Sequence, residues 1–478
     1  MGGLSKKVFQ INSLSDADTS NRLLLDSGNL LFKRASIGDG LGQKKLTAES
    51  IIEIYQEIGY DAVGIGPLDL AAGVDFIQKS KGKGFPWISC NITDTAGTPL
   101  FKPWTNKNLG NINIVITAIT AVPQKKFGDI IIQPWRKSLS DTIGKIKEEN
   151  DDAFIILLSS LSNDNNQQIT ELFPDINLLI GADPRKGNIS PHISENCLLV
   201  QTAKQGKYQG LLEIIFGKER IWGQDNGKLL ADLQNKMGSI NWQLRRLQKK
   251  DAVAVNKDKY KNTILRLQKE KDDLNSKIAA SKEILAQEKI TGAMNDRYIY
   301  RFIGLKKNMP NDQPTAEKLL LLNHKIKDLH QKEKRNKKVS KNISMLTENM
   351  VGHAVCETCH ETQASFWKTT GHASAYTTLL EKNKALDLDC LPCHLSLNTS
   401  KHDFQIRFDK SYLAYPPLLR SVGCESCHGP GKSHSIAPED FKVSRHPQER
   451  VCLTCHTPEH DDKFEYASKL NRITCPSE

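Results

Sequence analysis

The sequence predicts a multidomain chain of the α/β plus α class, with an α/β sandwich first, an antiparallel helical hairpin second and a mostly α-helical or irregular domain last. Three observations support this fold class. Short runs of Ile, Leu and Val alternate with helical stretches early in the chain, the middle repeats apolar residues every three or four positions, and the last part is rich in cysteine and histidine. We place the domains at 1–222, 223–350 and 351–478.

The first domain is predicted to contain a largely buried sheet. Helical stretches near 45–58 and 137–149 separate some of its apolar runs, which is typical of an α/β domain whose sheet is covered on both faces. The apolar runs lie at 22–25, 61–65, 112–118, 153–158, 176–180 and 197–201.

The middle domain is predicted to be an antiparallel coiled-coil hairpin. Apolar residues keep a heptad frame in two stripes, which are joined across 250–257. The stripes are Leu230, Leu233, Met237, Ile240, Leu244 and Leu247, followed by Tyr260, Ile264, Leu267, Leu274, Ile278 and Leu285. Alternating residues predict a strand near 296–305, and a third basic helix is expected at about 314–348, after Pro314.

The surplus of basic over acidic side chains lies entirely in this middle part of the chain. The net charge is zero over 1–224, +13 over 225–350 and −2 over 351–478. We therefore expect no specific nucleic-acid binding. The basic segment is compatible with an acidic redox partner, with peripheral contact to anionic lipid headgroups or with a cell-surface polymer. The simpler interpretation is a solvated helix face.

Four copies of C-x-x-C-H lie in the last domain. At this spacing both sulfurs can form thioethers to the vinyl groups of one haem, and the adjacent histidine reaches the iron as its proximal ligand. The attachment cysteines are Cys356, Cys359, Cys390, Cys393, Cys424, Cys427, Cys452 and Cys455, and the proximal histidines are His360, His394, His428 and His456. A thioredoxin-like motif or half of a zinc site requires no histidine after every second cysteine. We therefore expect four covalently bound haem c groups, with structural zinc as the alternative.

Histidine is the expected sixth ligand of these irons. All six methionines precede the first motif, and bis-histidine ligation implies lower reduction potentials than Met/His ligation. His434 follows the tight Gly-Pro-Gly turn at 429–431, so we expect it to serve an iron other than that of its neighbour. The histidines left over are His353, His372, His402, His434, His446 and His460. The alternative for each is a surface position or a contact to a haem propionate.

Covalent haem attachment predicts an extracytoplasmic location, in a periplasm, on a cell surface or in the extracellular space. The residues after Met1 are polar and do not form the apolar core of a signal peptide. The sequence also lacks a run of eighteen apolar residues. We therefore expect the export signal to lie outside the chain as given, with a native N-terminus upstream of Met1.

Residues 351–465 carry motifs with specific flanking residues. These are VGHAVCETCH at 351–360, FWKTTGHASAY at 366–376, CLPCH at 390–394, VGCESCHGPGKSH at 422–434 and HPQERVCLTCH at 446–456. This part of the chain resembles the tetrahaem cytochrome family of the electron acceptor of hydroxylamine oxidoreductase. The resemblance implies His372 and His434 as distal ligands and His446 as a third, with His353 and His402 competing for the fourth iron. It also implies that one haem can lack a sixth protein ligand.

Residues 1–216 carry a second set of motifs, including LLLDSGN at 23–29, GYDAVGIGPLD at 59–69 and NLLIGADPR at 177–185. They resemble the metallophosphoesterase domain of 5′-nucleotidases and UDP-sugar hydrolases. That family clamps phosphate between two metals held by Asp, Asn and His. Its first D-x-H strand would lie upstream of Met1. A sheet without that strand would leave backbone groups unpaired, which also favours an earlier native start.

The metal ligands of that family are replaced in this chain. Asn29 stands where the family has the Asp of G-D, Pro67-Leu68-Asp69 replaces N-H-E/D, and Ser160 replaces a histidine. Asp183 and Arg185 replace the G-H-x-H pair. Asp26 and Asp69 survive, but two carboxylates without imidazoles make a poor dinuclear site. We therefore expect no dinuclear metal and no phosphoesterase activity.

The function expected from the sequence is electron transfer with redox partner proteins. The degenerate domain would serve docking or assembly, and the chain could form a homo-oligomer or a haem-stacked assembly. The alternative from a different class is an oxidoreductase that acts on a small nitrogen or sulfur compound at a five-coordinate haem. A working metal-dependent 5′-nucleotidase is the third interpretation.

Overall fold

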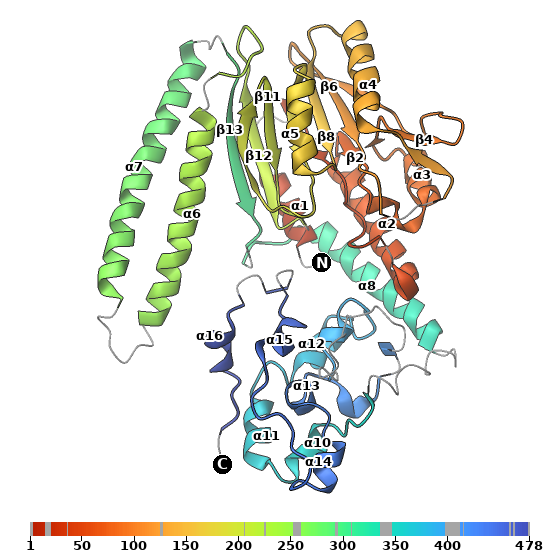
Figure 1. The fold of residues 1–478 in the computed structure, drawn as a ribbon, viewed down its shortest axis with the longest axis vertical. Helices are drawn as coiled ribbons and strands as arrows, with labels where there is room; N and C mark the ends of the chain where they lie inside the picture. The colour runs from red at the N-terminus through yellow and green to blue at the C-terminus, as the bar shows by residue number, and fades with distance from the viewer. Residues whose placement is uncertain are drawn as a thin grey trace. The chain divides into compact units, whose positions relative to one another are not determined.

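The computed structural model of the chain divides into two compact units (Figure 1). Unit 1 comprises Met1–Ala35 and Ile52–Thr315, and unit 2 comprises Ser36–Ile51 and Ala316–Glu478. The structure describes residues 3–14, 21–35, 37–124, 128–204, 206–223, 226–251, 260–291, 295–306, 308–334, 347–396, 412–413, 415–457, 460–461 and 464–476. The division into three domains at 1–222, 223–350 and 351–478 stays a prediction.

Unit 1 is built around a six-stranded sheet with the order β10-β11-β9-β8-β6-β5. Its four central strands are parallel, and the two edge strands run antiparallel to them. The strands are β5 (Trp104–Leu109), β6 (Ile112–Ile119), β8 (Phe154–Ser159), β9 (Ile176–Gly181), β10 (Ile189–Ser194) and β11 (Cys197–Gln201). A smaller parallel sheet contains β1 (Leu25–Asp26), β2 (Ala62–Gly64) and β3 (Trp87–Ile88). Strands therefore occupy most of five of the six apolar runs, whereas the first run, 22–25, shares only Leu25 with β1.

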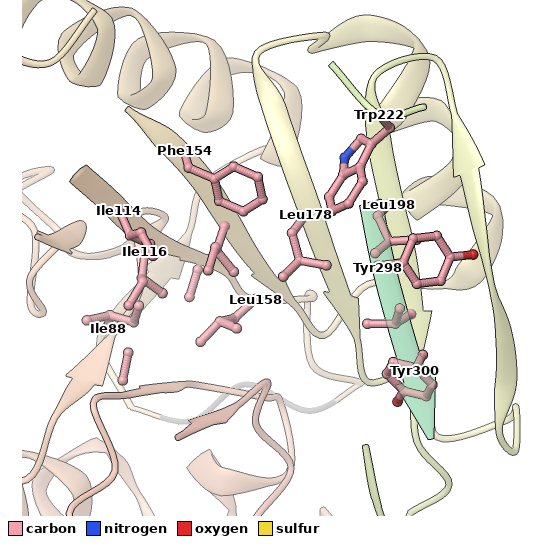
Figure 2. Packing of buried hydrophobic residues seen from close by; sticks show 14 residues of the cluster. Ile88, Ile114, Ile116, Phe154, Leu158, Leu178, Leu198, Trp222, Tyr298 and Tyr300 are labelled. Carbon is pink, nitrogen blue, oxygen red and sulfur yellow. The ribbon is translucent and has the colours of Figure 1, made fainter. Parts of the chain in front are cut away.

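The central sheet is buried on both faces, as its continuous apolar runs predict. On one face Val115, Leu157 and Leu179 pack with apolar residues of α4 (Trp135–Glu149) and α5 (Asn163–Leu172). The other face carries a cluster with an aromatic part, which Figure 2 shows. The unit also contains α1 (Leu4–Ser13), α3 (Val74–Gly82), the 3-10 turn η3 (Asp69–Ala72) and the antiparallel pair β4 (Ile92–Asp94) and β7 (Ile130–Ile132).

The strand predicted near 296–305 is present as β13 (Arg297–Gly304). It pairs antiparallel with β12 (Tyr208–Ile215) in a separate two-stranded sheet. Tyr298 from β13 is 2% exposed and packs edge-on against Trp222, with ring centroids 5.8 Å apart. The side chains of this strand thereby join the cluster on one face of the central sheet (Figure 2).

The two predicted middle helices are α6 (Asn226–Asp251) and α7 (Lys261–Thr291), which lie side by side (Figure 1). Ile240, Leu244, Leu267 and Leu274 from the two heptad stripes are buried between them. The two predicted helices are thus present and packed together, whereas the antiparallel coiled-coil hairpin stays a prediction.

The third predicted helix is α8 (Gln313–Lys334). Asp312 caps its start, because Oδ1 accepts a hydrogen bond from the backbone N–H of Thr315 at 2.9 Å. Residues 335–346 of the predicted helix lie outside the described residues.

Unit 2 consists mainly of short helices joined by irregular segments, as predicted for the last domain. Besides α8 it contains η2 (Gly38–Gly40), the first part of α2 (Leu41–Ile58), α10 (His353–Glu357), α11 (Glu361–Lys368), α12 (Ala375–Glu381), η5 (Leu391–Cys393), η7 (Pro417–Leu419), α13 (Cys424–His428), α14 (Lys432–Ile436), α15 (Glu449–Leu453) and α16 (Tyr466–Leu470). A small apolar core surrounds Leu388, Leu391 and Leu395. Among the described helices of the whole chain, none is both long and apolar enough to cross a membrane.

Candidate haem-binding site

The four C-x-x-C-H motifs lie on short helical turns of unit 2. The first, third and fourth lie on or at the ends of α10, α13 and α15, and the second begins just before η5. Backbone hydrogen bonds close the turns, for example from His360 N to Cys356 O at 3.0 Å and from His456 N to Cys452 O at 2.9 Å. A helical turn places residues four apart on one face, so the first cysteine and the histidine of a motif share a face.

The attachment cysteines of different motifs lie close to one another. A hydrogen bond with Cys356 of the first motif lowers the pKa of the Cys424 thiol in the third motif. Similarly, a hydrogen bond with Cys393 of the second motif lowers the pKa of the Cys455 thiol in the fourth to about 7. The four motifs therefore form two adjacent pairs, the first with the third and the second with the fourth.

Histidine rings also approach one another between motifs. The ring centroids of His360 and His434 are 6.2 Å apart, and their planes are inclined by 16°. The ring centroids of His372 and His456 are also 6.2 Å apart, with planes inclined by 60°. Thus His434 lies beside the proximal histidine of the first motif, although it follows the third motif in sequence.

Four of the candidate ligands have one ring nitrogen held by a hydrogen bond. In each case Nδ1 is engaged, which orients the ring and leaves Nε2 for a metal. The partners are Ala375 O for His394 at 2.5 Å, Ser444 O for His428 at 2.5 Å, Phe441 O for His434 at 2.7 Å and Asp461 Oδ2 for His456 at 3.0 Å. The residues present therefore fit the orientation that imidazole ligands of a haem iron require.

The remaining histidines differ in their surroundings. His353 packs on Trp367 with ring centroids 4.7 Å apart and lines an open pocket of about 340 Å³, together with Lys368 and Arg420. His446 and His460 are exposed to solvent, and His402 lies outside the described residues.

The sequence interpretation did not identify Glu425, which organises this site. Glu425 is the residue after the first cysteine of the third motif and is only 2% exposed. Its carboxylate accepts hydrogen bonds from the backbone N–H groups of Val351 at 2.9 Å, Gly352 at 2.8 Å and Gly431 at 2.8 Å. One side chain thus joins the segment before the first motif to the turn before His434. The signal available in the sequence was the position of this glutamate between the attachment cysteines Cys424 and Cys427.

In unit 1 the carboxylates of Asp26 and Asp69 accept hydrogen bonds from backbone N–H groups of the protein. Asp69 is fully buried and accepts from the backbone N–H groups of Asn29 at 2.7 Å, Leu31 at 2.8 Å and Gly66 at 2.9 Å. Burial raises the pKa of this carboxyl to about 7. Asn29 Oδ1 accepts from Leu68 N at 3.0 Å. These hydrogen bonds join the loop at Asn29 and Leu31 to the loop at Gly66–Asp69.

Asp26 lies next to a half-buried lysine, Lys7. Burial raises the pKa of Asp26, and attraction to the Lys7 ammonium opposes that rise. Lys7 Nζ donates to Tyr55 Oη at 2.6 Å, and Gly28 N donates to Asp26 Oδ1 at 3.0 Å. A cation beside this carboxylate disfavours a second cation there. Among the residues that the structure describes, no three His, Cys, Asp or Glu side chains gather as metal ligands.

Asp183 and Arg185, which replace the G-H-x-H pair, form an ion pair with two hydrogen bonds. Arg185 Nε and an Nη each donate to the Asp183 carboxylate at 3.0 Å, and Asn163 N donates to it at 3.0 Å. The hydrogen bonds from Arg185 are the main reason why the pKa of Asp183 falls to about 2.

Replacing Arg185 by methionine is therefore expected to move the acid unfolding of unit 1 to higher pH. The pKa of Asp183 is lower in the folded state than in the unfolded chain, so its stabilising contribution is complete above about pH 4 and is lost as the pH falls toward about 2. Circular dichroism between pH 2 and 7 measures the midpoint. Arg136→Met, at an exposed arginine paired with Gln168, is the control, and equal midpoints for the two variants would contradict the expectation.

Unit 2 has the features of a multihaem c-type cytochrome, namely four attachment motifs and histidine rings from different motifs that approach to 6.2 Å. The family described as "Cytochrome c554 and c-prime" matches residues 355–429. Cytochrome c-554 of Nitrosomonas europaea is 35% identical over 97 residues, which cover 17% of this chain and 39% of that protein. The C-terminal segment thus resembles the cytochrome c554 family, while the chain spans well under half the length of this relative.

Two solved structures are similar to this chain at low sequence identity. Sulfate thiohydrolase SoxB of Thermus thermophilus has 14% identity and a TM-score of 0.45, over 68% of this chain and 47% of that chain. A 5′-nucleotidase precursor, also of Thermus thermophilus, has 18% identity and a TM-score of 0.38, over 44% of this chain and 45% of that chain. The chain therefore spans about half the length of these proteins.

Proposed function

We propose that this chain is an extracytoplasmic multihaem c-type cytochrome that transfers electrons between redox partner proteins through four haem c groups. The observation that carries the proposal is the pairing of histidine rings from different motifs at 6.2 Å, beside four C-x-x-C-H turns. When bound, haem c supplies a one-electron iron couple. The protein contributes the attachment cysteines, the axial imidazoles and the hydrogen bonds that orient them.

The spacing of the histidine rings supports bis-histidine ligation. Metal–imidazole bonds of about 2 Å on opposite sides of one ion place the two ring centroids roughly 6 Å apart. His360 with His434, and His372 with His456, have this separation. We therefore assign His434 as the distal ligand at the first motif and His372 as the distal ligand at the fourth.

The distal ligands at the second and third motifs are less constrained. His446 lies two residues beyond Ser444, whose carbonyl holds the His428 ring, and we assign it to the third motif. His353 and His402 remain the candidates at the second motif.

The proximity of cysteines suggests an order for electron transfer. The first and third motifs are adjacent through Cys356 and Cys424, and the second and fourth through Cys393 and Cys455. Helix α13 of the third motif packs on α15 at the fourth, so the third and fourth motifs are also neighbours. The attachment sites thus follow the order first, third, fourth, second.

Intact-mass measurement of the native protein is the direct test. We expect a mass increment equal to four covalent haem groups and a strong Soret absorption. The double variant Cys390→Ser/Cys393→Ser is expected to lose one of these increments, because a thioether needs the cysteine sulfur. Cys90→Ser, outside the motifs, should keep all four. A colourless protein without any increment would refute the proposal.

Unit 1 is proposed to be a catalytically inactive phosphoesterase-like domain that serves docking or assembly. We expect no release of phosphate from nucleoside monophosphates in the presence of Mg²⁺ or Mn²⁺, because the groups at Asp26, Asn29 and Asp69 are engaged within the protein. A phosphate-release assay with an active 5′-nucleotidase as positive control measures this. Metal-dependent release above the no-enzyme rate would contradict the assignment.

A second candidate function is suggested by the pocket beside His353. Lys368 and Arg420 line this pocket of about 340 Å³, so it could admit a small nitrogen or sulfur oxyanion. An oxidoreductase of this kind requires one iron with an open coordination position. Low-temperature EPR of the isolated protein tests this requirement: low-spin signals alone would exclude this enzyme, whereas a high-spin ferric signal would meet the requirement.

A further inference from the structure

The segment Ser36–Ile51 belongs to unit 2, although it lies far from the attachment motifs in sequence. It contains the first half of α2, which packs closely on α8. A Cβ atom added at Gly42 would lie 3.1 Å from a side-chain methyl of Leu329. This early segment of the chain therefore contributes directly to the unit that carries the four motifs.

Gln43 lies at the centre of this contact and is 2% exposed. Its Nε2 donates to Asp387 Oδ1 at 2.6 Å, and its Oε1 accepts from Leu388 N at 3.0 Å. Since a backbone N–H only donates and a carboxylate accepts, the amide orientation is fixed. His330 Nε2 lies 2.9 Å from the same Oε1 and must donate to it, while His330 Nδ1 lies 2.8 Å from Glu333 Oε2.

The network continues to the second attachment motif. The backbone carbonyl of Asp387 accepts from Cys390 N at 3.0 Å and from Leu391 N at 3.0 Å, and its carboxylate accepts from Asp389 N at 2.9 Å. Burial first, and the Asp387 charge next, raise the pKa of Cys390 to about 12. Asp389 forms an ion pair with Lys44, the neighbour of Gln43 on α2. One buried amide thus holds the acidic segment that leads into Cys390.

We propose that Gln43 is a positioning residue for the second haem site: it holds Asp387 beside the attachment sulfur of Cys390 and thereby sets the midpoint potential of the haem attached there. This inference rests on the covalent attachment proposed above. A donor to the carboxylate reduces the negative charge felt at the sulfur, and charge and hydrogen bonding near a haem tune its potential. Removing the donor should stabilise the oxidised iron.

A spectroelectrochemical titration of the full-length holoprotein tests this. In Gln43→Leu, one of the four transitions is expected to move to lower potential while the other three stay in place. In Asp387→Asn, the same transition is expected to move to higher potential, because the charge itself is removed. In the double variant, Gln43→Leu should produce no further shift, since its effect passes through the Asp387 charge. Gln56→Leu, at the exposed glutamine of α2 that donates to Lys83 O, is the matched control and should leave all four in place.

The outcomes separate the inference from the function on which it rests. Intact mass before titration establishes whether Cys390 and Cys393 carry a haem, and its absence in the native protein refutes the proposed function. With four increments present, the inference is overturned if Gln43→Leu moves none of the four transitions or moves all four. It is also overturned if Gln43→Leu produces the same shift in the Asp387→Asn protein as in the native protein. If the Gln43→Leu protein does not incorporate haem, Asp387→Asn alone tests the inference. The inference is then overturned if no transition moves to higher potential in Asp387→Asn.

Discussion

In the variant His434→Ala, one of the four haem groups is expected to change from low-spin to high-spin iron. The ring of His434 lies 6.2 Å from that of His360, the separation of two imidazoles on one metal ion, and Phe441 O holds its Nδ1 at 2.7 Å. Without this ring the iron at the first motif keeps a single axial imidazole, which weakens the ligand field. Low-temperature EPR and the visible spectrum of the oxidised protein measure the change.

Added imidazole provides a second readout for this variant. Because the cavity left by the ring is the size of imidazole, millimolar imidazole is expected to restore the low-spin spectrum of His434→Ala. His460→Ala is the matched control, since His460 is exposed and has no ring partner among the described residues. An unchanged spin state in His434→Ala would exclude His434 as an iron ligand and leave its contact to His360 as packing.

The variant Glu425→Ala is expected to destabilise unit 2 by about 3–5 kcal/mol. Its carboxylate accepts three hydrogen bonds from backbone N–H groups, those of Val351, Gly352 and Gly431, and it is 2% exposed. Hydrogen bonds to a charged group contribute more than neutral ones, and alanine leaves the N–H groups at Gly352 and Gly431 buried without a partner. Thermal unfolding of the holoprotein, followed by Soret absorption, measures the loss.

A comparison of glutamates separates this loss from a general effect of charge. Glu439→Ala removes an exposed glutamate of the same unit, whose only described ion pair is with Lys442, and should change the stability by less than about 0.5 kcal/mol. Glu425→Gln keeps the shape of the side chain, but only the amide oxygen can still accept hydrogen bonds, because the NH₂ group is a donor. An intermediate loss of stability is therefore expected. Equal melting temperatures for Glu425→Ala and Glu439→Ala would show that the three hydrogen bonds contribute little.

The sheet and the helical hairpin could be predicted because their apolar residues are periodic. Ile112, Ile114 and Ile116 recur at every second position, and this alternation locates β6. The helix α5 was missed because its sequence NDNNQQITEL has few apolar residues. It is stabilised instead by a cap, in which Ser162 Oγ accepts from Asn165 N at 3.2 Å. Such a cap is visible in the sequence only when a helix is already suspected.

The attachment motifs could be predicted from local spacing, but the contacts between motifs could not. The approach of His434 to His360 joins residues 74 positions apart, and only the folded chain brings them together. The sequence did indicate that His434 lies beside a motif other than the one it follows, because of the turn at 429–431. Gln43 gave no such indication, since its role depends on burial and on partners far away in the sequence, and Glu425 was indicated only by its place between two attachment cysteines.

The membership of Ser36–Ile51 in unit 2 has a consequence for biogenesis. During synthesis this stretch leaves the ribosome long before the residues that it must meet, so the cytochrome part cannot reach its final packing until the C-terminus has emerged. A fragment that begins at residue 316 would also lack Gln43 and expose Leu329 on α8. A single recombination event between the two ends of the gene would therefore separate Ser36–Ile51 from Ala316–Glu478, the two segments that form unit 2.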